Sequence, residues 1–252
     1  MQRLVMSGAA PADAAQVALT GTDEQPPSSR AGGGRVLALP GADDLVRGLG
    51  RAAMALDAEV VTATLTAQLD AHGVVRTWDE VLRPLLVSVG HRWARTGEGV
   101  DVEHLLSDCV SMSLRQHASG LTPTAPPRPV LLASAPEDQH VLPLHVLAAT
   151  LAERGYSSRV LGASVPAEAL RDAVRRTGPA AVFVWSQTRA TGSAEVLAGL
   201  AEAFPRTSVL AGGPGWASDE LPVGVTLCPG LVEAADLVED AVNPARLAQT
   251  PA

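Results

Sequence analysis

The 252-residue chain is 46% hydrophobic with a mean hydropathy of +0.16, enough to bury one large core or two smaller ones. Its 27 acidic and 19 basic residues give a formal charge of −8, which argues against a broad phosphate-binding surface. Cys109 and Cys228 stand far apart and without CxxC spacing, so neither a disulfide framework nor a zinc site is indicated. With no membrane-length apolar run and no secretory signal pattern, we expect a cytoplasmic protein without a membrane partner.

The amino-terminal part has two different compositions. Residues 10–19 (APADAAQVAL) are expected to form a short helix. Residues 20–40 combine Gly, Pro and Ser without sustained periodicity, which is typical of a flexible linker.

Residues 41–120 have the apolar spacing of helices, with breaks near Asp57, near Gly73 and in the run 97–99. Four helices joined by short connections predict a four-helix bundle. Asp101 is expected to cap the fourth helix. The third helix has one continuous apolar face, formed by Trp78, Val81, Leu82, Leu85, Leu86, Val89 and Trp93.

The start of that third helix carries a capping-box pattern. Thr77 and Glu80 have the spacing at which each side chain can bond the other's backbone amide. The sequence therefore predicts that the helix begins at this point.

Residues 121–129 are rich in proline and separate the helices from a region of different character. Short apolar runs then alternate with helical segments up to residue 240, and 241–252 form a tail. This alternation predicts an α/β fold with a doubly wound, parallel, five-stranded sheet. Strands are expected at 130–133, 159–161, 181–184, 208–211 and 223–227, and helices at 140–155, 166–177, 193–203 and 231–239.

Polar residues and a glycine pair follow three of these strands, at the edge where parallel sheets bind ligands. Asp138 and His140 follow the first strand, Ser186 and Thr188 the third, and Gly212-Gly213 the fourth. The residues alone leave simpler roles open. Asp138 could cap the next helix with His140 in its exposed first turn, and the glycines could form only a tight turn.

In this order the motifs resemble the cobalamin-binding domain of methionine synthase and the corrinoid proteins, over residues 128–240. The resemblance implies a flavodoxin-like (Rossmann-type) sheet. It also implies that His140 is the lower axial ligand of cobalt and that Asp138 is the partner that orients it.

The same resemblance implies which residues surround the nucleotide tail of the cofactor. Ser186 would contact the tail and Gly212-Gly213 would leave room for it. Two positions depart from the family's pattern: Thr188, still counted among the cofactor-binding residues, replaces an apolar residue, and Pro143 replaces a glycine. We expect Pro143 to alter the path of the chain beside the tail without removing the ligand.

A second motif lies in the helical region: Trp93, nine further residues, then Glu103 and His104. It resembles the signature of the CarH/LitR type of photoreceptor regulators. By that resemblance, Trp93 packs against the upper adenosyl group and Glu103 and His104 hydrogen-bond around it. Ala94 stands where some members carry a histidine that captures cobalt after photolysis, and His91 is nearby. The simpler reading is that Trp93 only completes the apolar core and that the negative charge of Glu103 interacts favourably with the N-terminus of its helix.

Together the motifs predict the sensor and oligomerisation part of a transcription regulator that is not an enzyme. It would bind adenosylcobalamin in preference to methylcobalamin, respond to light, and form a dimer or tetramer. DNA would be bound only through an amino-terminal MerR-type winged helix absent from this chain. Residues 1–19 resemble the end of such a domain, so Met1 is either an internal methionine or a natural start.

Two other functions remain open on the sequence. One is a corrinoid methyl carrier that works with methyltransferases, although such carriers lack the Trp-x9-Glu-His signature. The other is a module that has lost its cofactor and acts as an antirepressor through protein contacts. Fold resemblance alone does not decide among the three.

Overall fold

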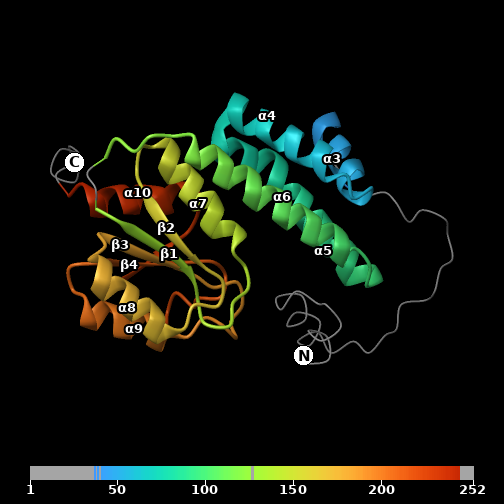
Figure 1. Cartoon of the computed structure of the whole chain (residues 1–252). Helices are drawn as coiled ribbons and strands as arrows, with labels where there is room; N and C mark the ends of the chain where they lie inside the picture. Colours follow the sequence, from blue (N-terminus) through green and yellow to red (C-terminus); the bar gives the residue numbers. More distant parts are fainter. Residues whose placement is uncertain (1–36, 38, 40, 126–127, 245–252) are drawn as a thin grey trace, which may run out of the picture. The chain divides into compact units, whose positions relative to one another are not determined.

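The computed structural model describes residues 37, 39, 41–125 and 128–244. The chain divides into two compact units, residues 1–114 and 115–252. The first is helical and the second is an α/β sheet (Figure 1). The helix expected at 10–19 and nearly all of the predicted linker lie outside the described residues.

The helical unit contains the four helices that the sequence predicts, with Asp43 and Asp57 capping the first two through the amides of Val46 and Val60. Their bounds are α3 Asp44–Met54, α4 Ala58–Thr77, η1 Trp78–Leu82 with α5 Arg83–Thr96, and α6 Val100–Ser119. The last turn of α6 already belongs to the second unit.

The predicted capping box at Thr77 is wrong. The chain breaks earlier, at Gly73 (φ 76°, ψ 174°), a conformation that is accessible almost only to glycine. Thr77 itself is helical and caps nothing, and Glu80 pairs with Arg76 at 2.8 Å. From Val74 the helix runs without interruption through η1 into α5.

The segment η1 is a single π turn in which the amide of Arg83 donates to the carbonyl of Trp78. It ends at Leu82, two residues before Pro84, which has no N–H and whose ring crowds the preceding turn. A second correction concerns Asp101: α6 begins at Val100, so Asp101 lies in its first turn and is not its cap.

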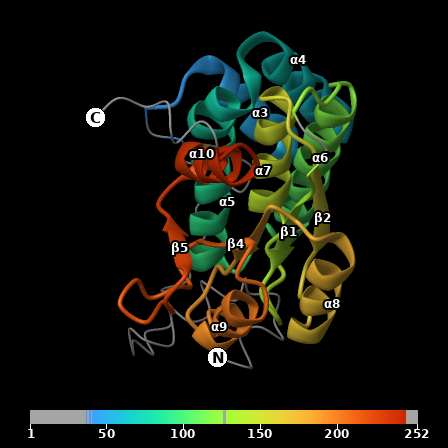
Figure 2. The ribbon, with the colours of Figure 1, turned by 90° about the vertical axis from the view of Figure 1, so that its left-hand side faces the viewer.

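The second unit is a five-stranded parallel sheet with the order β2-β1-β3-β4-β5, seen edge to edge in Figure 2. This is the flavodoxin-like order that the sequence predicts. The strands are β1 Val130–Ser134, β2 Ser158–Gly162, β3 Ala181–Trp185, β4 Ser208–Gly212 and β5 Val225–Cys228.

Helices cover both faces of this sheet. One face packs against α7 and α10, and the other against α8 and α9 (Figures 1 and 2). Alternate strand residues enter the two cores, as period-2 geometry requires. The helices are α7 Leu142–Glu153, α8 Ala167–Thr177, α9 Ala194–Ala203 and α10 Leu231–Val242. Helix α10 reaches Val242, and residues 245–252 of the tail predicted from residue 241 lie outside the described residues.

Candidate functional site

The site lies where the strand order reverses, at the carboxyl ends of β1 and β3. These two strands are paired in register, so their last residues, Ser134 and Trp185, lie opposite each other. In sheets of this type the crevice beyond such a pair of strands is the usual ligand-binding position.

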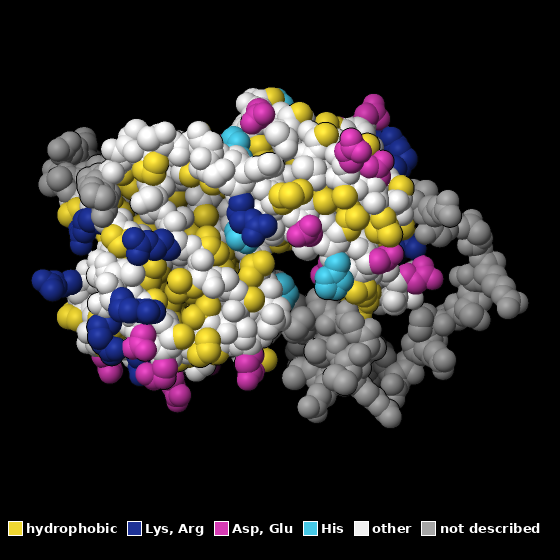
Figure 3. Space-filling view, viewed as in Figure 1, with side chains coloured by type: hydrophobic (Ala, Val, Ile, Leu, Met, Phe, Trp, Pro, Cys, Tyr) yellow, Lys and Arg dark blue, Asp and Glu magenta, His cyan; other side chains and the backbone are white. Residues whose placement is uncertain are grey.

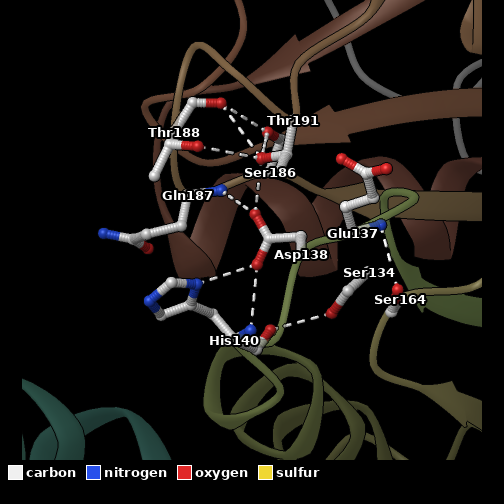
Figure 4. A network of polar contacts seen from close by, with 9 residues as sticks. All are labelled: Ser134, Glu137, Asp138, His140, Ser164, Ser186, Gln187, Thr188 and Thr191. Carbon is white, nitrogen blue, oxygen red and sulfur yellow. Dashed lines mark hydrogen bonds and ion pairs between the residues drawn. The ribbon is translucent and has the colours of Figure 1, made fainter. Parts of the chain in front are cut away.

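Asp138, in the loop after β1, has a side chain only 1% exposed and accepts four hydrogen bonds (Figure 4). Its Oδ1 accepts from the backbone amide and the ring Nδ1 of His140, at 2.9 and 2.8 Å. Its Oδ2 accepts from the amide of Gln187 at 2.6 Å and the hydroxyl of Thr191 at 2.8 Å. These donors use the full accepting capacity of the carboxylate.

The hydrogen bonds keep Asp138 ionised despite its burial. Burial by itself raises the pKa of this carboxyl, but the bonds from His140, Gln187 and Thr191 outweigh it and hold the pKa below its ordinary value. An ionised carboxylate can only accept, so the proton lies on Nδ1 of His140. In the neutral ring this leaves the lone pair of Nε2 available to a metal.

His140 precedes helix α7, which begins at Leu142, and its side chain is 27% exposed. Its carbonyl accepts from the hydroxyl of Ser134 at 2.8 Å, which ties the loop to the end of β1. No side chain caps α7. The simpler reading, in which Asp138 caps this helix and His140 lies in its first turn, is therefore wrong.

The loop that carries Asp138 is fixed from the neighbouring strand as well. Glu137 and Ser164 both have positive φ, 65° and 49° respectively. Two hydrogen bonds connect the loops in which they lie. The Glu137 amide donates to the Ser164 hydroxyl at 3.0 Å, and the Ser164 amide to the Asp138 carbonyl at 2.7 Å. Backbone strain of this kind persists only where its surroundings enforce it.

Ser186, fully buried, and Thr188 lie in the loop after β3 and form a hydroxyl cluster with Thr191. The Ser186 hydroxyl donates to the carbonyl of Thr188 at 3.0 Å and lies 2.8 Å from the Thr191 hydroxyl. Sequence reasoning missed both Thr191 and Ser164. The only signal for Thr191 was a hydroxyl residue in the same loop as Ser186.

The glycine pair at the end of β4 is required by the packing of the chain itself. A Cβ on Gly212 would lie 2.2 Å from the ring of Phe183, and one on Gly213 would lie 2.3 Å from the carbonyl of Ser186. Gly213 also has φ +99°. The glycines thus let the ends of β3 and β4 approach closely, and clearance for a ligand stays a prediction.

In the helical unit, Trp93, Glu103 and His104 all lie within about one turn of the connection 97–99. Trp93 is buried at the end of the apolar face of α5, Glu103 is half-buried and His104 is exposed. The end of α5 is capped by Gly97, whose amide donates to the carbonyl of Trp93 at 2.7 Å. The structure therefore places the three residues at one end of this unit.

Within the described residues, no group of three or more His, Cys, Asp or Glu side chains could hold a metal ion. A metal bound at this edge of the sheet would take Nε2 of His140 as its ligand from the protein. A corrin ring already supplies four nitrogen ligands to its cobalt, so one imidazole with an ionised partner fits that cofactor.

The described surface agrees with the charge of the sequence. On the face shown in Figure 3, arginine side chains lie in small groups among acidic and apolar ones. That face of the described part presents no continuous basic surface. None of the described helices has the length and apolar character needed to cross a membrane.

Comparison with known protein families identifies both units. Residues 128–227 match the family model "B12 binding domain", and residues 45–116 match a second family with the same description. Two segments of the chain therefore match models of B12-binding domains. The predicted cobalamin-binding character is thereby confirmed, whereas the roles of single residues stay predictions.

A curated relative shares sequence with more than half of the chain. The chain is 37% identical over 161 residues to the HTH-type transcriptional repressor CarH of Myxococcus xanthus, which covers 62% of this chain and 52% of the relative. The chain thus spans about half the length of this relative. The predicted resemblance to CarH-type regulators is confirmed at the level of homology.

A solved structure agrees with the fold. The Methanosarcina barkeri monomethylamine corrinoid protein superposes with a TM-score of 0.58 at 13% identity, over 77% of this chain and 96% of that one. At this identity the likeness concerns the fold alone. It confirms the predicted helical region followed by a Rossmann-like sheet.

Proposed function

We propose that this chain is the sensor and oligomerisation part of an adenosylcobalamin-dependent, light-responsive transcription regulator. One observation carries the proposal: within a B12-binding domain, the buried Asp138 holds His140 with Nε2 free to bind cobalt. The homology to a CarH repressor favours regulation over catalysis.

Each residue of the sheet unit then has a distinct part. His140 would bind the cobalt, and Asp138 would fix its tautomer and the orientation of its ring. Ser186, Thr188, Gly212 and Gly213 border the nucleotide tail.

The helical unit carries the other proposed cofactor contacts. Trp93 packs against the adenosyl group, and Glu103 and His104 supply polar contacts around it. The burial of Trp93 also suits a plain core role, so only a ligand-dependent measurement separates the two.

When bound, adenosylcobalamin supplies a cobalt–carbon bond that light breaks. The chain holds the cofactor and couples its upper face to assembly into dimers or tetramers. DNA contact belongs to a MerR-type winged helix outside residues 41–244, as the predicted linker suggests.

Absorbance and size-exclusion chromatography of the protein reconstituted in darkness and then exposed to green light test this proposal. We expect a bound alkylcobalamin spectrum that converts on illumination, with a change in elution volume. His140→Ala should abolish or strongly weaken binding, and the exposed control His72→Ala should not.

Three outcomes would contradict the proposal. Failure to bind any cobalamin would indicate a cofactor-free interaction module. Binding without a light-dependent change in assembly would remove the sensor role. Preference for methylcobalamin, with turnover when a methyl donor and a methyltransferase are added, would favour the methyl carrier.

A further inference from the structure

Trp185, the last residue of β3, carries a buried polar atom without a partner. Its side chain packs against the core on the α7 and α10 face, and among the described residues its Nε1 has no hydrogen-bond acceptor. Buried indole N–H groups normally find one. Trp216 in the same unit does so, donating to the carbonyls of Gly212 and Val184 at 2.9 and 3.2 Å.

The neighbouring residue, Ser186, cannot donate a hydrogen bond to a ligand without breaking bonds that it already makes. The hydroxyl of Ser186 is occupied by the carbonyl of Thr188 and the hydroxyl of Thr191. It also faces Gly215, where an added Cβ would lie 2.2 Å from Ser186 Oγ. At this strand end, Trp185 holds the unused donor.

Trp185 is held next to the loop that carries His140. It pairs with Ser134 across the sheet, and the hydroxyl of Ser134 donates to the carbonyl of His140. The indole also packs closely against Gly213, because a Cβ added to that glycine would lie 3.0 Å from Trp185 Cε2. The unused donor is therefore on the α7 and α10 face of the sheet, at the end of the strand that neighbours the His140 loop.

The proposed function, on which this inference rests, creates a matching acceptor. Once an imidazole from the protein occupies the lower cobalt position, the base of the nucleotide tail is displaced from the metal. Its ring nitrogen then has a free lone pair, which would be costly to bury without a donor.

We propose that the indole N–H of Trp185 donates a hydrogen bond to this displaced ring nitrogen. Trp185 is thus a specificity-determining residue that selects cobamides whose lower base carries an acceptor nitrogen. The base lies between the end of β3 and helix α7.

Three adenosylated corrinoids test the inference: adenosylcobalamin, its p-cresolyl analogue, whose base has no nitrogen, and cobinamide, which has no nucleotide tail. Adenosylcobalamin must release its own base from cobalt before His140 can bind the metal, whereas the cresolyl base never binds cobalt, so the two wild-type affinities differ for this reason as well. The test of the inference is therefore the change in each affinity when the indole N–H of Trp185 is removed.

Trp185→Phe removes the donor and keeps an aromatic ring. We expect it to weaken adenosylcobalamin binding roughly tenfold and to leave cresolyl and cobinamide binding unchanged. The control Trp78→Phe, in the helical unit, should leave the preference for a nitrogen-containing base unchanged. Equal weakening for all three corrinoids, or tighter adenosylcobalamin binding, would show that the ring only packs or fills space.

Failure of the underlying proposal is distinguishable. If wild-type protein bound none of the three corrinoids, the proposed function itself would fall, and this inference with it. If wild-type protein bound them with a spectrum that depends on His140, but Trp185→Phe did not selectively weaken adenosylcobalamin binding, only the role of Trp185 would be lost.

Discussion

Asp138 shows how a buried charge is stabilised at this site. Removing a carboxylate from water is costly, and here four donors from three residues in two loops offset that cost. The same bonds orient His140, so the stability of the loop and the readiness of the imidazole have one origin.

Thr191→Val tests the contribution of the hydroxyl network. The variant leaves Oδ2 of Asp138 with the amide of Gln187 as its remaining donor, so His140 is held less firmly. Loss of such a supporting bond should weaken adenosylcobalamin binding roughly tenfold. Absorbance titration measures it, with Thr177→Val on α8 as the matched control. Equal affinities of the two variants would show that Thr191 has no such role.

Cys228 should be almost unreactive in the folded protein. Burial, aided by the negative charge of Glu233, raises the pKa of its thiol to about 12 from 9.0. At pH 8 alkylation should therefore be roughly a thousandfold slower than in urea. Above about pH 9 the unfolded chain loses this proton while the folded chain keeps it, so folding stability decreases as pH rises. Peptide mapping after alkylation checks this, and rapid native labelling of Cys228 would contradict it.

The sequence predicted some site residues and not others for a physical reason. Asp138 and His140 follow a strand in a short spacing, and the topology of parallel sheets places them at the binding edge. Thr191 and Ser164 reach the site through loop conformations, including the positive φ of Ser164, which no periodicity encodes. The unpaired indole of Trp185 likewise became visible only with the packing around it.

At the scale of elements, hydrophobic periodicity predicted every described strand and helix of the sheet unit to within a few residues. It did less well at helix ends in the helical unit. The start expected at Thr77 was wrong because the backbone conformation of Gly73 determines where the helix breaks. The capping pattern at Thr77 therefore falls inside a helix that has already begun.

Two glycine substitutions in the helical unit should have opposite effects. Gly73→Ala forces a Cβ into φ 76°, ψ 174° and should destabilise the protein by about 1 to 3 kcal/mol. Gly48→Ala, inside α3 with its nearest contact 3.8 Å away, should stabilise it by up to about 1 kcal/mol. Urea denaturation measures both. A neutral Gly73→Ala would mean that the break at this position carries no strain.

At the scale of the whole molecule, each unit has a core of its own. Leu106 in the first and Leu132 in the second are both fully buried. Changing either to alanine should cost about 2 to 5 kcal/mol. Hydrogen exchange should then accelerate mainly in the unit that carries the substitution. Uniform acceleration across the chain would instead indicate a single cooperative unit.

Both units match B12-binding families, one after the other along the chain. The proposed function depends above all on the binding of cobalt by His140. Electron paramagnetic resonance of the protein reconstituted with cob(II)alamin, with ordinary or ¹⁵N-labelled histidine, tests that claim most directly. We predict a nitrogen splitting that changes from a triplet to a doublet with ¹⁵N-histidine, and we predict that this doublet is absent from labelled His140→Ala. A triplet that persists unchanged with labelled histidine would show that the cofactor's own base still holds the metal, and would contradict this account.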